Sequence, residues 1–412
     1  TIMLKNAQNN ISRVQEEFIE IIYSVADILD LKDIEYDVAF GSDDIDCFAG
    51  GLRRVKVKGV RHGIKLKTCL IVKWHPNPVD RMCFREYYRR EYVFHTKIVP
   101  ELLTIQRNMK IEGLKMKFLN VVLARIDHDK EAIVVQEIEK LFFLDRFKKM
   151  DILHASLVVK NIAILHGLSF VLKTRYPTKF GEIMELCSHD VVYNDITNVS
   201  STLVRYFNTS VDVVSDPVYK KKLLEFEPYV STALYKCTLP DKDYSTICHS
   251  DCWTNNMVFK YQGTKPVEVV FVDYQLARFA SPVTDLSYFL YMSTDREFLI
   301  QYYDSLLNLY YGTLTAVLHC CHLNVDKIYP KSIFEKHLKE YSVLGLIEAL
   351  ISMKIITAVA EEAAEMTDMK YHFSEGLCEY VSHNQSLYVE RVNGVVNDFF
   401  ERGYSLLDIL DK

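Results

Sequence analysis

Residues 246–291 constrain the fold more than any other part of the chain. Within them, two short apolar runs, residues 256–261 and 267–272, flank a polar turn at residues 262–266 that contains glycine and proline. Strand-length apolar runs separated by such a turn predict a β-hairpin. Residues just before the first strand and just after the second would then lie together at the open end of the ribbon.

Three polar residues occupy that end of the predicted hairpin. Asp251 precedes the first strand, Asn256 opens it, and Asp273 follows the second. Carboxylate and amide oxygens suit Mg²⁺, which takes oxygen ligands and keeps several waters. Enzymes of phosphoryl transfer divide such residues between one Asp near the acceptor and an Asn and a second Asp on metal. We therefore expect Asp251 to be the catalytic residue and Asn256 and Asp273 to bind metal.

The motifs around these residues resemble a known superfamily. The segment from His249 to Asn256 has the form His-Ser-Asp-x4-Asn and is similar to the His-Gly-Asp-x4-Asn catalytic loop of the aminoglycoside phosphotransferase and choline kinase superfamily. Residues 272–275 resemble its metal-binding segment, and Pro282 and Asp285 stand where that superfamily has Pro and Asp. The resemblance covers roughly residues 35–380.

Further residues point to one family within that superfamily. Trp253, Asn255 and Arg278 resemble the ecdysteroid kinase-like, or CHK kinase-like, family. Two positions depart from the family pattern, because Ser250 replaces the usual Gly and Tyr274 the usual Phe. Since Gly reaches positive φ at little cost, Ser250 makes the turn before the catalytic residue less permissive.

The resemblance implies an α+β, protein-kinase-like fold with two lobes. We expect residues 1–138 to form a β-rich nucleotide-binding lobe that begins with a helix over residues 1–30. Residues 139–412 would form a mostly helical lobe that carries the catalytic hairpin, residues 246–275. The resemblance places a hinge between the lobes near residues 135–140 and ATP–Mg²⁺ between them.

In the small lobe, Lys73 ends a predicted strand and Glu91 lies on a predicted helix over residues 84–99. The resemblance implies that these two form the ion pair that positions the α and β phosphates. A surface Lys with a buried stem is the alternative for Lys73, and Glu86 is the alternative partner.

Other nucleotide-binding residues are assigned by the resemblance. Gly50 and Gly51 precede a predicted strand over residues 52–57, and their backbone amides would cover phosphate, although a plain hairpin turn fits them equally. The hinge would comprise the consecutive residues Gln136, Glu137 and Ile138, whose backbone groups would pair with adenine.

Two residues and one segment of the second lobe have structural interpretations. His166 is expected to be a buried structural histidine. Asp285 starts a predicted helix, where a carboxylate can cap backbone N–H groups, and the family uses it to brace the catalytic loop. Residues 343–360 predict a buried helix rather than a membrane span, because Glu348 and Lys354 interrupt the apolar run.

Composition excludes several classes of function. A net charge of −6 without a long basic run gives no reason to expect nucleic-acid binding. The ten cysteines show no paired spacing, and the N-terminus lacks an apolar signal region. We therefore expect a cytoplasmic protein with reduced thiols and no membrane span. The sequence makes no prediction of the oligomeric state.

Together these features predict an ATP- and Mg²⁺-dependent phosphotransferase with a small-molecule alcohol as acceptor. The family name implies a steroid alcohol such as an ecdysteroid. The alternatives are a kinase of the same fold for choline, an amino alcohol or a xenobiotic alcohol, a non-catalytic binding protein of kinase fold, and a metal-dependent hydrolase.

Overall fold

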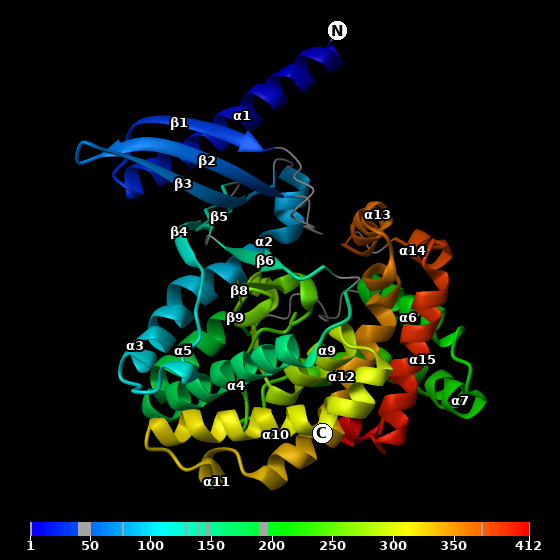
Figure 1. Ribbon diagram of the computed structural model, residues 1–412. Helices are drawn as coiled ribbons and strands as arrows, with labels where there is room; N and C mark the ends of the chain where they lie inside the picture. The colour runs from blue at the N-terminus through cyan, green and yellow to red at the C-terminus, as the bar shows by residue number, and fades with distance from the viewer. Residues whose placement is uncertain are drawn as a thin grey trace. The chain divides into compact units, whose positions relative to one another are not determined.

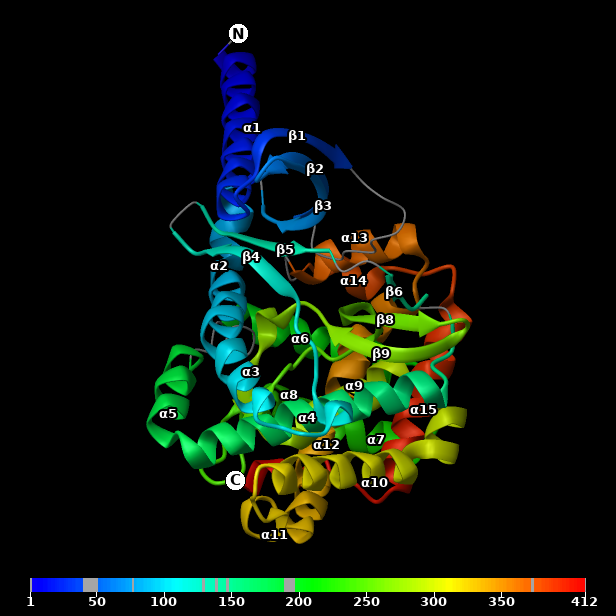
Figure 2. The ribbon, with the colours of Figure 1, turned by 60° about the vertical axis from the view of Figure 1, so that its left-hand side comes forward.

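The computed structural model describes residues 2–39, 51–75, 78–127, 130–137, 140–145, 148–188, 197–371 and 374–411. Its contacts divide the chain into two compact units (Figures 1 and 2), the first comprising Thr1–Lys97 and Phe118–Glu139, the second Ile98–Lys117 and Lys140–Lys412. Residues 98–117, expected in the first lobe, pack with the second unit. Gly50 and Ile138 lie outside the described residues.

The first unit is built on an antiparallel sheet with the strand order β1-β2-β3-β5-β4. Its strands are β1 (Lys32–Ala39), β2 (Leu52–Arg61), β3 (Ile64–Lys73), β4 (Asn120–Arg125) and β5 (Ala132–Gln136). Strand β2 extends beyond the range predicted for it, residues 52–57, to a two-residue turn with β3 at His62 and Gly63, which have φ of 51° and 76°. Positive φ at both central residues gives a turn whose twist matches that of the strands.

Helix α1 (Ile2–Ile28) covers this sheet. Its apolar residues recur at helical spacing, so one stripe faces the strands while Glu and Asp face solvent. The core beneath it is aliphatic and is completed by one Trp, with Ile21, Ile22, Val25, Val55, Val57, Leu70, Val72 and Trp74 among its members. Helix α2 (Pro78–Val93) packs on β5 and continues through a π-helical turn, Phe94–Ile98, into the second unit.

The second unit is mostly helical. Its helices are α3 (Val99–Arg107), α4 (Ile152–Arg175), α5 (Pro177–Leu186), α6 (Thr197–Val211), α7 (Pro217–Phe226), α8 (Val230–Thr238), α9 (Pro282–Ser293), α10 (Arg296–Cys320), α11 (Val325–Ile328), α12 (Lys331–Thr357), α13 (Ala360–Tyr371), α14 (Gly376–Glu379) and α15 (Gln385–Glu401). Helices α4 and α10 lie side by side, and α12 packs on α9 and α15 (Figures 1 and 2). By length and composition α4 is apolar enough to cross a membrane, but most of it is buried inside the structure.

Two small antiparallel sheets carry the segment that is predicted to be catalytic. One has the order β6-β8-β9, with β6 (Leu141–Phe143), β8 (Met257–Gln262) and β9 (Lys265–Phe271), and the other pairs β7 (Thr246–Cys248) with β10 (Arg278–Ala280). The predicted hairpin is therefore present as β8–β9. With a sheet-rich first unit and a helical second unit, the predicted α+β class is confirmed.

Helices α9 and α12 approach closely at Gly345, which lies on α12. A Cβ atom built on Gly345 would overlap the backbone carbonyl of Ser287 on α9. Only glycine permits this approach, because any side chain would have to occupy the space of the neighbouring backbone. The contact fixes the spacing of two helices that both reach the candidate site described next.

Candidate active site

The carboxylate of Asp251 is held at the end of β7 by two neutral donors. The hydroxyl of Tyr288 donates to its Oδ1 at 2.7 Å, and the amide Nδ2 of Asn256 donates to its Oδ2 at 2.7 Å. Neither donor carries a charge, so the carboxylate is oriented without being neutralised. It is partly buried and retains lone pairs for a further hydrogen bond.

The same contacts determine which side-chain atom of Asn256 can coordinate a cation. Its Nδ2 also donates to the backbone carbonyl of Asp251 at 3.0 Å. Because the amide nitrogen is engaged on that side, the amide oxygen is the atom that can coordinate a cation. The side chain is buried, with 8% of its surface exposed, so its orientation is fixed by these bonds.

Asp273 lies at the same end of the hairpin. The backbone N–H of Val272 donates to the carbonyl of Asn256 at 3.0 Å, which joins the two strand ends. Asp273 itself has φ of 63°, in the left-handed region, where a non-glycine residue costs about 1–2 kcal/mol. Its carboxylate and the amide oxygen of Asn256 are a pair of hard oxygen donors, a set that fits Mg²⁺. The structure thus brings Asp251, Asn256 and Asp273 together as the sequence predicts.

His249 connects the catalytic loop to the end of β9. Its Nδ1 accepts from the backbone N–H of Asp251 at 3.2 Å, and its Nε2 lies 3.0 Å from the carbonyl of Val272. A ring that accepts at Nδ1 and donates at Nε2 is a neutral imidazole with its proton on Nε2. The ring also packs edge-on against Phe271. This histidine therefore sets the distance between the loops of Asp251 and Asp273.

Asp285 holds the loop before Asp251 through hydrogen bonds to its backbone. Its carboxylate oxygens accept from the backbone N–H groups of His249 and Ser250, each at 2.7 Å, and Nε2 of His166 lies 3.2 Å away. Burial raises the pKa of Asp285, but the hydrogen bond and charge of His166 outweigh it and hold the pKa below its usual value. Ser250 has φ of 68°, the conformation expected to favour glycine, and the bond from its N–H holds it there.

Two expectations about these buried residues are tested by the structure. The cap of α9 is Ser281, whose hydroxyl accepts from the N–H of Val283, so Asp285 does not cap the helix. Asp285 stands one turn inside α9, where its side chain reaches the loop instead. His166 is fully buried as predicted, and its Nδ1 bonds to the hydroxyl of Tyr310 at 2.8 Å.

His166, Cys248 and Asp285 also form the group of potential metal ligands that the described residues contain. Their ligand atoms lie within 4.8 Å of one another. Burial, followed by the charge of Asp285, raises the pKa of the Cys248 thiol well above its usual value. Asp285 already accepts hydrogen bonds from the backbone of His249 and Ser250, and His166 bonds to both Asp285 and Tyr310, so this group is better explained as a hydrogen-bonded brace.

In the first unit, Lys73 and Glu91 form the predicted ion pair. Nζ of Lys73 lies 2.7 Å from Oε2 of Glu91, and both residues are at least nine-tenths buried. Burial alone would raise the pKa of Glu91. The charge of Lys73 and the contact with His95 have the larger, opposite effect, so the pKa lies below its usual value and the carboxyl is ionised. The alternative partner Glu86 is exposed and pairs with Arg89 instead.

The remaining predicted nucleotide-binding residues have local partners. A Cβ on Gly51 would lie 2.9 Å from the carbonyl of Trp74, and the N–H of Trp74 donates to the carbonyl of Gly51 at 2.8 Å. Close strand packing therefore explains Gly51. Glu137 donates its backbone N–H to Cys69 at 2.9 Å, so that group is already used within the sheet. The side chain of Gln136 bonds to Asn120 at 2.9 Å.

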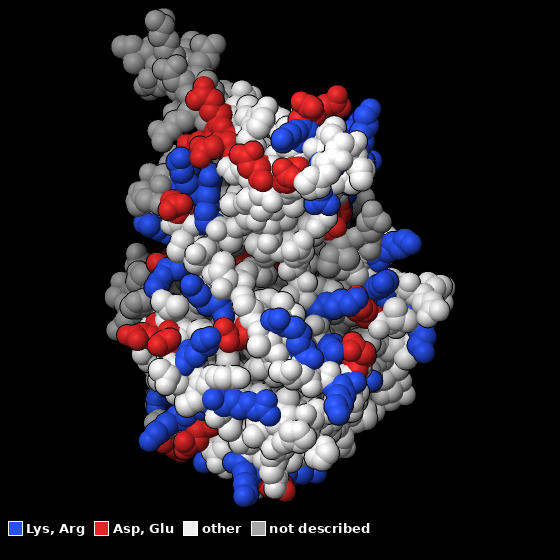
Figure 3. All heavy atoms as spheres, turned by 90° about the vertical axis from the view of Figure 1, so that its left-hand side faces the viewer, with Lys and Arg blue, Asp and Glu red and all other residues white. Residues whose placement is uncertain are grey.

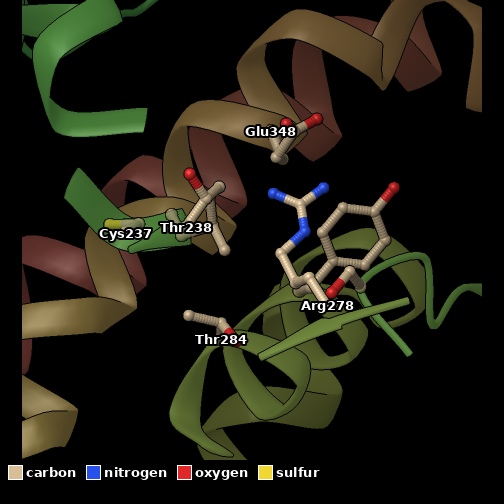
Figure 4. Close-up of a pocket in the computed structure, with 8 residues that line it drawn as sticks. Cys237, Thr238, Arg278, Thr284 and Glu348 are labelled. Atoms are coloured by element: carbon tan, nitrogen blue, oxygen red, sulfur yellow. The ribbon is translucent and has the colours of Figure 1, made fainter. Parts of the chain in front are cut away.

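A small pocket opens beside Asp251 in the second unit (Figure 4). Its lining comes from α8, the catalytic loop, β10, α9 and α12, and consists of Cys237, Thr238, Ser250, Arg278, Thr284, Tyr288, Leu344 and Glu348. Tyr288 and Glu348 were not predicted as site residues. Tyr288 follows Asp285 by one helical turn, a spacing that places both on the same face of α9.

A larger cavity of about 670 Å³ lies elsewhere in the second unit, among residues of α3, α4 and β9, and no predicted site residue lines it. Ion pairs at its edge join Lys115 to Glu112 and Lys117 to Glu268. On the face shown in Figure 3, acidic and uncharged side chains separate the basic ones, so no continuous basic surface covers that face.

Comparison with known proteins identifies the family. The sequence matches the ecdysteroid kinase-like family over residues 44–324, which is more than half of the chain. The chain belongs to this family. This ecdysteroid kinase-like protein finds no match among curated protein sequences.

Solved structures similar to this ecdysteroid kinase-like protein include three small-molecule kinases. Ethanolamine kinase of Plasmodium vivax is 11% identical with a TM-score of 0.40, covering 90% of this chain and 84% of that chain. Choline kinase of Cryptosporidium parvum is 11% identical with a TM-score of 0.44, covering 95% and 98%. A microcompartment-associated aminopropanol kinase is 14% identical with a TM-score of 0.39, covering 91% and 99%. At these values the likeness does not bear on substrate.

Proposed function

We propose that this ecdysteroid kinase-like protein transfers the γ-phosphate of ATP to the hydroxyl of a small-molecule alcohol. The observation that carries the proposal is the carboxylate of Asp251, which Tyr288 and Asn256 orient at the same hairpin end as Asp273. A carboxylate that is fixed but not neutralised suits a group that must accept a proton.

In the proposed step, the acceptor hydroxyl donates a hydrogen bond to a remaining lone pair of Asp251. As the bond from the acceptor oxygen to phosphorus forms and the bond to the β-phosphate oxygen breaks, the hydroxyl proton passes to this carboxylate. Placement of the hydroxyl supplies much of the acceleration, because phosphoryl transfer asks for little covalent chemistry from the protein.

The amide oxygen of Asn256 and the carboxylate of Asp273 are the residues that would hold Mg²⁺. The ion would supply positive charge to the phosphate oxygens. The left-handed backbone of Asp273 supports this role, since strained residues persist where the surrounding structure requires them. His249 would keep this metal-binding end at a constant distance from Asp251.

Lys73 would contact the nucleotide phosphates, with Glu91 fixing its position. A buried Lys paired with a buried Glu supports a phosphate-binding role more than a surface role, because the alternative of an exposed snorkelling Lys does not fit its burial. The same pair favours a kinase over a metal-dependent hydrolase, which has no need of it.

For the acceptor, we propose a steroid alcohol of the ecdysteroid kind, with choline or a xenobiotic alcohol as the alternative. A non-catalytic binding protein is disfavoured because each residue proposed for base and metal is present. Free thiols are found at Cys69, Cys187, Cys237, Cys248, Cys252, Cys320, Cys321 and Cys378, which supports the proposed cytoplasmic location.

Two measurements test this function. The melting temperature should rise with ATP in the presence of Mg²⁺ and rise much less without it. Mass spectrometry of a panel of alcohols incubated with ATP–Mg²⁺ should then find a mass increase of one phosphate on at least one acceptor. Metal-dependent hydrolysis of a phosphate ester without any transfer from ATP would instead support the hydrolase.

A further inference from the structure

Resting on the proposed function, we propose that the pocket beside Asp251 binds a second hydroxyl group of the acceptor, through Glu348 and Arg278. The acceptor would then be a polyhydroxylated alcohol rather than a quaternary ammonium alcohol. Asp251 would take the hydroxyl that is phosphorylated, and the pocket would take the hydroxyl that identifies the substrate.

The pocket adjoins the catalytic carboxylate through two of its own lining residues. Tyr288 lines the pocket and donates to Oδ1 of Asp251, and Ser250 is the neighbour of Asp251 in the chain. A molecule whose hydroxyl meets Asp251 therefore has another part of its surface at the pocket mouth. The pocket lies wholly within the second unit.

The size of the pocket restricts the group that enters. Its cavity volume of about 10 Å³ is room for one water-sized group. A hydroxyl fits this volume, whereas a trimethylammonium group is several times larger. The close approach of α9 and α12 at Gly345 keeps the walls at this spacing.

The charges of the pocket select the same group. Glu348 on α12 and Arg278 on β10 both line it, and each is at least nine-tenths buried (Figure 4). In Figure 4 the guanidinium of Arg278 extends in the direction of Glu348. A group between a carboxylate and a guanidinium must offer both a donor and an acceptor. A hydroxyl does both, an ammonium only donates, and a carboxylate only accepts.

Other features of the lining agree with this selection. An arginine repels a cationic head group, and an aromatic cage is the usual site for a quaternary ammonium. Tyr288 is the one aromatic residue among the pocket-lining residues that the structure describes, and its hydroxyl is engaged by Asp251. Thr238 and Thr284 add hydroxyls rather than rings.

The test compares two enzymes on two kinds of acceptor. The probes are a polyhydroxylated steroid, its analogues that each lack one hydroxyl, and choline. For the wild type, we expect at least one analogue to lose about 10²-fold or more in kcat/KM, because a site built for a hydroxyl rejects a substrate without it. In Glu348→Gln, the same deletion should cost less than about tenfold, since the contact is already weakened.

Glu340→Gln is the matched control, since Glu340 is a largely buried Glu on the same helix that does not line the pocket. In this control, removing the hydroxyl from the acceptor should lower kcat/KM as much as it does in the wild type. Arg278→Lys provides a second variant, and the shift of melting temperature by ATP–Mg²⁺ shows that each variant is folded.

An equal penalty in the wild type and in Glu348→Gln would overturn the inference. A preference for choline over every polyhydroxylated probe would also overturn it, while leaving the proposed kinase function in place. A protein that neither binds ATP–Mg²⁺ nor phosphorylates any probe would overturn the proposed function as well.

Discussion

The two units hold their proposed functional charges in opposite ways. In the first unit, Lys73 and Glu91 are buried against each other at 2.7 Å, so each charge neutralises the other. In the second unit, neutral groups orient the carboxylate of Asp251, namely the hydroxyl of Tyr288 and the amide of Asn256. The first arrangement fixes a position, and the second preserves a charge.

This difference indicates what each unit needs from its ligand. A cation already paired with a carboxylate presents its remaining N–H groups as hydrogen-bond donors, which suits phosphate oxygens. A carboxylate that neutral donors orient, as Tyr288 and Asn256 orient Asp251, keeps its negative charge and so favours a proton or a cation as its ligand. Substitutions that remove one charge at a time should therefore act differently in the two units.

The largest effects are expected at the two carboxylates of the hairpin end. Asp251→Asn should lower kcat by about 10²–10⁴-fold while ATP–Mg²⁺ affinity stays near normal, because only a proton acceptor is lost. Asp273→Asn should weaken the Mg²⁺ dependence of nucleotide binding as well as the rate, with partial recovery at high Mg²⁺. Calorimetric titration of ATP with and without Mg²⁺, alongside steady-state rates, separates the two. Loss of metal-dependent binding in the Asp251 variant, with retention in the Asp273 variant, would reverse the assignment.

Next in size is Lys73→Met, which should lower the rate by about 10²-fold, the usual effect of removing one preorganised donor. It should also lower the free energy of unfolding by roughly 3–5 kcal/mol, because Glu91 is left as an unpaired buried charge. Adding Glu91→Gln should restore much of the stability but none of the rate. Lys67→Met, at an exposed position on the same strand, is the control. Recovery of rate together with stability would mean that the pair is purely structural.

A smaller effect is expected for Tyr288→Phe, which removes one hydrogen bond to the carboxylate of Asp251. The rate should fall about tenfold with unchanged ATP–Mg²⁺ affinity, since a hydrogen bond to a charged group is worth about 1.5–3 kcal/mol at most. Tyr291→Phe is the control for effects on packing. Tyr291 lies on the same helix as Tyr288, and the substitution removes a hydroxyl that bonds to Asp398. Equal rate losses in both variants would show that Tyr288 acts through packing alone.

The smallest effect concerns stability rather than rate. Burial raises the pKa of Glu348, with the charge of Lys370 opposing it. A carboxyl whose pKa is raised by folding binds its proton more tightly when folded, so its contribution to stability falls as the pH rises above its unfolded pKa of about 4.3. Glu348→Gln should therefore melt higher than wild type at pH 7–8, and the difference should shrink toward pH 4. A lower melting temperature at pH 8 would contradict this.

The sequence predicts well how residues are arranged at the end of the hairpin in the second unit, because that information is local. Asp251, Asn256 and Asp273 flank two strands, and a hairpin brings such residues together whatever the surrounding fold. The ion pair of Lys73 and Glu91 is confirmed as a contact by its distance, although its role in binding phosphate stays a prediction.

Short and charged strands were missed. β1 contains Asp33, Glu35 and Asp37, which mask the alternation of Ile34, Tyr36 and Val38, and β7 and β10 are three residues each. Short strands have too few residues to show a period, so only their partners in the sheet define them. The strand predicted over residues 52–57 was likewise too short, since Gly59 pairs with Leu66 inside the β2–β3 ladder.

The sequence could not predict site residues that reach the pocket from helices far away in the chain. Glu348 interrupts an apolar run just as Lys354 does, and the two look alike in sequence. In the structure, Lys354 donates to the carbonyls of Leu377, Cys378 and Tyr380, whereas Glu348 lines the pocket beside the catalytic loop. Only the packing of α12 on α9 distinguishes a structural charge from a candidate binding group.

The glycine contact between α9 and α12 also limits how this protein can evolve. Gly345 lies three residues before Glu348, and its partner Ser287 is next to Tyr288 in the chain, so one backbone contact sets the spacing of a proposed substrate ligand and a proposed orienting residue. A larger residue at position 345 would separate both at once and disturb Asp251. New acceptors are therefore expected to arise through exchange of the side chains that line the pocket, while its width is inherited unchanged.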